Sequence, residues 1–186
     1  MGRTLSAVLI GAAILIPVAA QAGWRDAASP FDQSRLERLE EARSRGLSES
    51  NGVARAVLDA PTTHKPITGN WQCRTLKLGG MTPSVTYSWF RCRVFEYNGA
   101  LRFAKLSGSQ RMAGTLYPEG EGYVYLGASW VKGETPHRYS GNGDSVGAAA
   151  TPDDQIGLLT ATVRGARLEM PYPVQESDFD VVELRR

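Results

Sequence analysis

The stretch Phe90–Lys105, FRCRVFEYNGALRFAK, predicts the fold of this chain most directly. Two runs rich in aromatic and branched residues flank Asn98-Gly99, a pair that favours a type I′ turn because both residues tolerate positive φ. The pattern predicts an antiparallel hairpin with strands over Val85–Tyr97 and Ala100–Leu106.

Similar runs, separated by Gly, Pro, Asn and Asp, continue on both sides of this hairpin. They predict further strands over Ile67–Leu78, Arg111–Tyr117, Gly122–Lys132, Gln155–Val163, Arg167–Met170 and Asp178–Leu184. The expected fold class is therefore mainly β (α+β), with an antiparallel β-barrel or strongly curved sheet of about eight strands. Residues 67–184 would form this sheet.

Two helices are expected before the sheet, within residues 29–60. Ser29 is a favoured N-cap and Pro30 suits the first helical position, so a helix is predicted over Phe31–Arg45 and is expected to end at Gly46. A second, shorter helix is predicted over Ser50–Leu58. The first helix should lie on the domain surface, because its apolar stripe is narrow and consists of Leu36, Leu39 and Ala42.

Residues 1–22 have the pattern of a cleaved signal peptide. Arg3 precedes an apolar run, Leu5–Val18, and Ala20-Gln21-Ala22 fits the small-x-small cleavage site. The mature protein would be a single domain, residues 23–186, in the periplasm or secreted, with no membrane span after cleavage. A membrane anchor is the alternative, but the apolar run is short for a bilayer core of about 30 Å.

The charge of the mature chain is nearly balanced, because removing Arg3 leaves twenty basic residues against nineteen acidic ones. Nucleic-acid binding needs a basic surplus on one face, so no nucleic-acid partner is expected.

Cys73 and Cys92 are expected to form a disulfide, since an exported protein meets an oxidising compartment. A catalytic thiol is the alternative, but both cysteines lie in predicted strands. Placing Cys73 opposite Cys92 predicts a register in which Trp71 faces Val94 and Thr75 faces Phe90, with a turn over Gly80–Val85. The apolar members of these pairs would share the core face, and the opposite face would carry Gln72, Arg74, Arg91 and Arg93.

Several polar groups are candidate contacts for a ligand or a partner. Arg74, Arg91 and Arg93 could hold an anion, or could simply lie on a solvated face. His137, Arg138 and Tyr139 lie in the long irregular stretch Gly133–Asp154, which could contact a partner or have no such role.

Signatures of catalysis and of metal binding are weak in this sequence. His64 and His137 are the only histidines, and neither has the close spacing to carboxylates such as Asp153 or Asp154 that metal sites use. No nucleophile elbow, zinc-protease motif or P-loop is present. A hydrolase would have to combine dispersed carboxylates: Glu119, Glu121, Asp178 and Asp180. No catalytic residue, cofactor or metal site is predicted.

Gly69-Asn70-Trp71, at the start of the first predicted strand, resembles the Gly-x-Trp signature of lipocalins. In that family the Trp plugs one end of an eight-stranded barrel, and a late Arg often stacks on it. The resemblance therefore implies that Arg185 or Arg186 contacts Trp71.

A second resemblance covers nearly the whole mature chain. It is carried by Pro66–Arg74, Tyr123–Ala128, Ile156–Leu159, Leu168–Pro173 and Glu176–Val181. These runs resemble the DUF4893 family of exported bacterial proteins, a resemblance that implies an envelope location and no particular chemistry.

The function expected from these observations is that of a non-enzymatic envelope protein that binds a small hydrophobic ligand or another protein. One alternative is a periplasmic inhibitor or assembly factor that uses residues 133–154 as its contact surface. The other is a hydrolase with dispersed carboxylates.

Overall fold

The computed structural model describes residues 23–48, 50, 52–81, 83–141 and 151–186. The expected signal peptide, residues 1–22, lies outside the described residues, as does the middle of the predicted long loop, residues 142–150. In the described part of the chain, none of the helices has the length and apolar character needed to cross a membrane.

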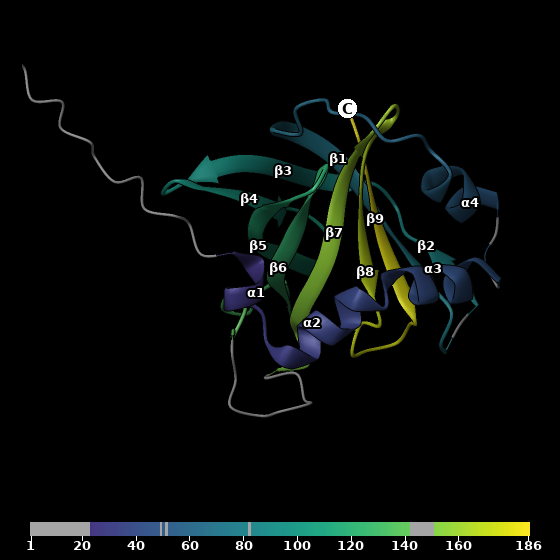
Figure 1. Ribbon diagram of the computed structural model, residues 1–186, viewed down its shortest axis with the longest axis horizontal. Coiled ribbons are helices and arrows are strands. Elements are labelled where there is room, and N and C mark those ends of the chain that lie inside the picture. The colour runs from purple at the N-terminus through teal and green to yellow at the C-terminus, as the bar shows by residue number, and fades with distance from the viewer. Residues whose placement is uncertain (1–22, 49, 51, 82, 142–150) are drawn as a thin grey trace, which may run out of the picture.

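The strands form one antiparallel sheet that closes on itself (Figure 1). Their bounds are β1 Gly69–Leu78, β2 Ser84–Thr86, β3 Phe90–Tyr97, β4 Ala100–Lys105, β5 Gln110–Glu119, β6 Gly122–Val131, β7 Asp154–Thr162, β8 Gly165–Pro171 and β9 Phe179–Arg185. β1 pairs with β3, and each strand from β3 to β8 pairs with the next one in sequence. β9 returns to pair with β1, which closes the sheet, while β2 is an extra strand beside β1. The predicted mainly β fold is therefore confirmed, and of its two expected forms, a barrel or a strongly curved sheet of about eight strands, the structure has the barrel, with β2 in addition.

The predicted hairpin is present at β3 and β4. Tyr97 pairs with Ala100, and the two turn residues have the expected positive φ, 50° at Asn98 and 74° at Gly99. The prediction of a single strand over Val85–Tyr97 was wrong, because residues 87–89 interrupt it and separate β2 from β3.

The predicted register of the first two strands was wrong by two residues. Trp71 pairs with Cys92, Cys73 with Phe90, and Gly69 with Val94. Because side chains alternate with a period of two, an even shift keeps every residue on its predicted face. Cys73 and Cys92 consequently still meet as a disulfide, diagonally across the pair, with Cα atoms 5.8 Å apart.

Within residues 23–68, as far as the structure describes them, four helices precede the sheet: α1 Trp24–Ala27, α2 Pro30–Glu37, α3 Leu39–Ser48 and α4 Gly52–Leu58. The predicted long helix is broken at Arg38, and Gly46 does not end it. Gly46 is instead buried within α3, where an added Cβ would lie 3.0 Å from the Phe179 ring, so a glycine allows the helix to approach β9. Figure 1 shows α2 and α3 crossing the outside of β7, β8 and β9.

The alternation of side chains divides the apolar residues between the lumen and the outer face of the barrel. The lumen is packed mainly by apolar side chains, among them Ile67, Trp71, Val94, Phe103, Leu116, Tyr125, Leu159, Leu168, Val182 and Leu184. On the outer face, Leu76, Leu78, Phe179 and Val181 pack against α3 and α4. A smaller outer cluster packs Trp24 of α1 against Val124, Leu126 and Ile156.

Candidate functional site

The two ends of the barrel are built differently. Short turns join β3 to β4, β5 to β6 and β7 to β8 at one end, here called the closed end. Ile67 plugs this end and accepts a hydrogen bond from Trp71 Nε1 at 2.8 Å. The other end, here called the loop end, carries the longer connections 79–89, 132–153 and 172–178.

A cavity of about 270 Å³ lies at the loop end. Its inner wall is made by side chains near the ends of the strands that meet the longer connections: Thr75, Lys77, Lys105, Gln110, Met112, Ser129, Gln155, Met170 and Asp180. The lumen is thus apolar toward the closed end and polar toward the loop end. We define this loop-end cavity as the candidate site.

Lys77 and Asp180 form a charge pair on neighbouring strands at the cavity wall. Their Nζ and Oδ2 atoms lie 4.0 Å apart, and Lys77 Nζ also donates to Glu176 at 2.5 Å. Burial alone would lower the pKa of Lys77, but Asp180 and Glu176 raise it above its usual value. Burial raises the pKa of Asp180 to about 6, although Lys77 and a hydrogen bond from Ser177 act in the opposite direction.

Lys105 is the other lysine of the cavity, and its surroundings are different. Its residue is only 8% exposed, its Nζ donates to the backbone oxygen of Gln110 at 2.9 Å, and the same atom lies 4.5 Å from the centre of the Phe90 ring. Among the described residues, no carboxylate lies within 4.0 Å of its ammonium group. Burial, together with the positive charges of Arg111 and Lys77, lowers the pKa of Lys105 to about 8.

Tyr125 brings a buried hydroxyl group to the same half of the lumen. Its ring lies directly over the paired residues Gly114 and Gly127. A Cβ added to Gly114 would lie 2.5 Å from ring carbon Cε2, and a Cβ added to Gly127 would lie 2.2 Å from Oη, so only glycines leave room for the ring. The hydroxyl group is fully buried and has no hydrogen-bond partner in the described structure. Burial raises the pKa of Tyr125.

Gln155 also carries a buried polar atom without a partner. Its strand position pairs with Gly127, beneath the Tyr125 hydroxyl, and its side chain lines the cavity. The Oε1 atom accepts no hydrogen bond from any described residue. Buried polar atoms in folded proteins are normally hydrogen-bonded, so Tyr125 Oη and Gln155 Oε1 together indicate a place where a polar ligand or water completes the site.

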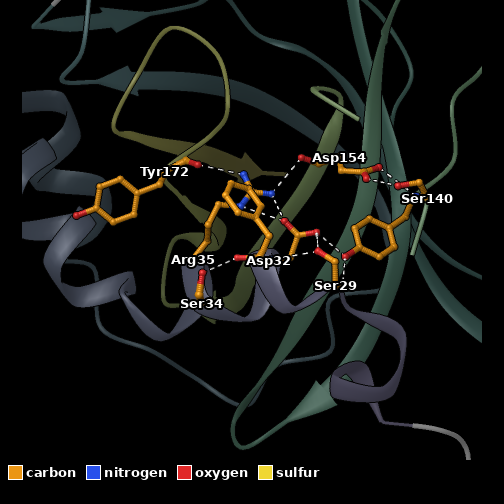
Figure 2. Close-up of polar contacts among 9 residues, drawn as sticks. Ser29, Asp32, Ser34, Arg35, Ser140, Asp154 and Tyr172 are labelled. Atoms are coloured by element: carbon orange, nitrogen blue, oxygen red, sulfur yellow. Dashed lines mark hydrogen bonds and ion pairs between the residues drawn. The ribbon is translucent and has the colours of Figure 1, made fainter. Parts of the chain in front are cut away.

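The rim of the cavity is held in place by a polar network on the outside of the barrel. Figure 2 shows Arg35 directed toward Asp32, the Tyr172 backbone oxygen at 3.0 Å and the Asp154 backbone oxygen at 3.2 Å. Asp154 in turn accepts hydrogen bonds from the backbone and side chain of Ser140. This network fixes residues 139–140, and therefore the start of the long loop, against α2 and β7.

The predicted contact residues of the long loop lie beside the cavity rather than inside it. His137 Nδ1 lies 3.0 Å from Asp153, and both side chains line the rim. The Tyr139 hydroxyl donates to Asp32 and accepts from the Ser29 amide, and burial is the main cause that raises its pKa. Arg138 is exposed. All three residues also border an open groove of about 680 Å³ on the outside of β4 and β5.

The remaining predicted contact residues belong to β1 and β3. Trp71 is buried at the closed end, and Arg186 stacks on it at 4.6 Å, in the way that the lipocalin resemblance implied. Arg74 is paired with Glu183 at 2.7 Å, while Arg91 and Arg93 are exposed on the outer face. None of the three arginines lines the loop-end cavity.

The structure does not bring the four dispersed carboxylates together. Glu119 and Glu121 lie at the β5–β6 turn of the closed end, near Arg25 and His64, whereas Asp178 and Asp180 lie at the loop end. His64 and His137 are likewise separated, and the described residues contain no group of three metal-ligating side chains.

Sequence reasoning missed Lys77, Lys105, Tyr125 and Gln155 as members of a site. The signal was present in the alternation: Lys77 follows Trp71 and Cys73 at even spacing, and Lys105 follows Phe103 two positions later. A lysine on the core face of a strand is unusual and points to a functional or paired charge.

Comparison with known proteins identifies the family of the chain. No curated protein and no solved structure matches the chain. The domain of unknown function DUF4893 matches residues 24–184, which include the four helices, the cavity and all of the barrel except Arg185, the last residue of β9. The chain belongs to the DUF4893 family.

Proposed function

We propose that this protein is an exported, non-enzymatic binding protein that holds a small molecule in the loop-end cavity of its barrel. The observation that carries the proposal is the buried, unpartnered Gln155 Oε1 in the wall of a cavity of about 270 Å³, with the equally unpartnered Tyr125 Oη over Gly127 on the neighbouring strand. Leaving such atoms unpaired costs about 1 to 3 kcal/mol each, and a bound polar ligand removes this cost.

The structure changes the kind of ligand that we favour. The sequence suggested a hydrophobic ligand, but the apolar part of the lumen is occupied by the protein's own side chains. The free volume of the loop-end cavity is bordered by lysine, glutamine, serine and aspartate side chains. This distribution supports a small polar or amphipathic molecule, with its polar groups directed into the barrel.

Export is supported by the leader-like residues 1–22 and by the Cys73–Cys92 disulfide, which oxidising compartments favour. A binding role rather than catalysis is supported by the arrangement of the cavity. Within the described structure, His137 is paired with Asp153, and no hydroxyl group is hydrogen-bonded to it as a nucleophile would be.

Native mass spectrometry of residues 23–186, recovered from a bacterial periplasm, tests this proposal. We expect an additional small mass that leaves the protein on gentle activation. Ser129→Phe fills the cavity and should abolish the additional mass, whereas Ser34→Phe, on the exposed side of α2, should retain it. A bare mass for the unmodified protein, or an equal additional mass in the Ser129→Phe variant, would contradict the proposal.

A second candidate function is protein binding through the long loop, and the outer groove beside His137, Arg138 and Tyr139 favours it. Arg138 is exposed and, unlike His137 and Tyr139, makes none of the contacts that anchor the loop in the described structure. Arg138→Glu should therefore abolish co-purification of a partner without lowering the melting temperature. Retained co-purification in this variant would exclude the groove as the contact surface.

A further inference from the structure

We propose that the loop-end cavity selects a small carboxylate, with Lys105 as the counter-ion of its acidic group. This inference rests on the proposed function and specifies the chemistry of the ligand.

Among the described residues, Lys105 differs from the other buried cations because it has no carboxylate partner. The other buried cations of the described structure have carboxylate partners, Arg35 with Asp32 and Arg167 with Glu169. Lys77, the second lysine of the cavity, is paired with Glu176 and Asp180. Lys105 has only a backbone oxygen and the face of Phe90. An ammonium group carries three donors, and a buried charge without a counter-ion is costly.

The acidic groups around the cavity do not supply that counter-ion. Asp180 is engaged by Lys77 and Ser177, Asp153 by His137, Asp154 by Ser140, and Glu134 by the backbone amide of Val131. The charged groups that act on Lys105 are Arg111 and Lys77, both positive, and together with burial they lower its pKa. An anion entering the cavity would reverse this effect and stabilise the protonated amine.

Two further groups restrict the ligand. Gln155 Oε1 in the cavity wall requires a donor such as a hydroxyl or amino group, and Tyr125 Oη, over the paired residue Gly127, can donate to an oxygen atom of a ligand that reaches it. The cavity of about 270 Å³ lies just below the range of about 300 to 1,000 Å³ typical of drug-sized ligands. These properties together describe a small hydroxy or amino acid, and lactate with its neutral amide, lactamide, is a suitable pair of probes.

The experiment measures the Lys105 side chain directly. The chain has four lysines, so ¹³C-lysine labelling gives few resonances, and a Lys105→Arg variant assigns the one of interest. Titration with lactate should raise the pKa of Lys105 by about one unit, the lower end of the effect of a close opposite charge, while lactamide should not change it. Lys105→Gln should weaken lactate binding at least tenfold, Lys105→Arg should retain part of it, and exposed Lys65→Gln should not affect it.

The outcomes separate this inference from the proposed function. If lactamide shifts the resonances of Thr75, Ser129 and Gln155 as lactate does, and the Lys105 pKa does not move, the cavity is a ligand site but the carboxylate selection is wrong. A native ligand without an acidic group would overturn the inference in the same way. If neither probe shifts a cavity resonance and the native mass is bare, both proposals are wrong. The pKa is measured on the unmodified protein, and the Lys105→Arg variant serves only to assign the resonance.

Discussion

Asp180 is the residue whose environment departs most clearly from what its position on β9 would suggest. It is a carboxylate 5% exposed on the lumen side of the barrel, where Ser177 Oγ donates to it at 2.5 Å. Lys77 lies 4.0 Å away, yet desolvation outweighs this attraction and raises the pKa of Asp180 to about 6. The folded protein therefore prefers the neutral form of this acid.

This raised pKa predicts a pH dependence of stability. Between about pH 4 and pH 6 the folded state binds more protons at Asp180 than the unfolded chain does, so the free energy of unfolding falls as the pH rises through this window. The total loss should be about 3 kcal/mol, since each pKa unit corresponds to about 1.4 kcal/mol. Asp180→Asn should remove the loss and make the protein more stable than the unmodified form at pH 7.

Urea unfolding at a series of pH values measures this effect. The difference in the free energy of unfolding between the unmodified protein and Asp180→Asn isolates the contribution of Asp180. The control is Glu121→Gln at an exposed position, which should leave the pH dependence of the free energy of unfolding unchanged. A difference that does not vary between pH 4 and pH 7 would show that Asp180 is ionised normally in the folded protein.

At the scale of elements, α2 is attached to the barrel by a polar network rather than by a broad apolar face. Ser29 caps the helix by accepting from the Asp32 amide, as its position in the sequence predicted, and Asp32 also pairs with Arg35. Arg35 then reaches backbone oxygens of Tyr172 and Asp154, on the connection after β8 and at the start of β7. The helix consequently holds two segments of the loop end together (Figure 2).

Removing one partner of this buried pair should be strongly destabilising. Asp32→Ala leaves the Arg35 guanidinium buried without a counter-ion, and we expect the free energy of unfolding to fall by about 3 to 5 kcal/mol. The double variant Asp32→Ala, Arg35→Met should recover part of this loss, because no uncompensated charge remains. Denaturant unfolding of the single and double variants checks both statements.

The exposed pair Arg38 and Glu41 on the neighbouring turn gives a matched control. Its side chains are about half exposed, so Glu41→Ala should have little effect on stability. Equal losses for Asp32→Ala and Glu41→Ala, or a double variant as unstable as Asp32→Ala, would contradict the explanation.

At the scale of the whole molecule, β1 connects the parts of the barrel. It pairs with β2 and β3 on one side and with β9 on the other, so it closes the sheet and carries one half of the disulfide. The bridge joins Cys73 and Cys92 across the lumen face of β1 and β3, at a sequence separation of 19.

Reduction of this disulfide should lower the stability of the whole barrel. The closed loop predicts a loss of about 3 kcal/mol in the chain-entropy description, because the bridge limits the unfolded chain more than it changes the folded one. Urea unfolding with and without reductant measures the loss, and a Cys73→Ala, Cys92→Ala variant should be unaffected by reductant. An unmodified protein whose unfolding does not respond to reductant would show that the bridge contributes nothing.

Local sequence determined much of this architecture. The two-residue alternation predicted which faces of β1 and β3 are buried, and Asn98-Gly99 predicted the hairpin, because both signals depend only on neighbouring residues. The β1–β3 register could not be obtained in this way. Registers that differ by an even number of residues bury the same faces, so the alternation does not distinguish between them. The register on β1 also changes between β2 and β3, across residues 87–89.

The candidate site, in contrast, could not be predicted from local sequence. Lys77, Lys105, Tyr125, Gln155 and Asp180 come from five different strands. The alternation in the sequence places Lys77 and Lys105 on core-facing positions of their strands, but it does not show that all five residues share one end of one lumen. That was decided only by the tertiary structure, because the pairing of β9 with β1 closes the sheet and sets these long-range neighbours.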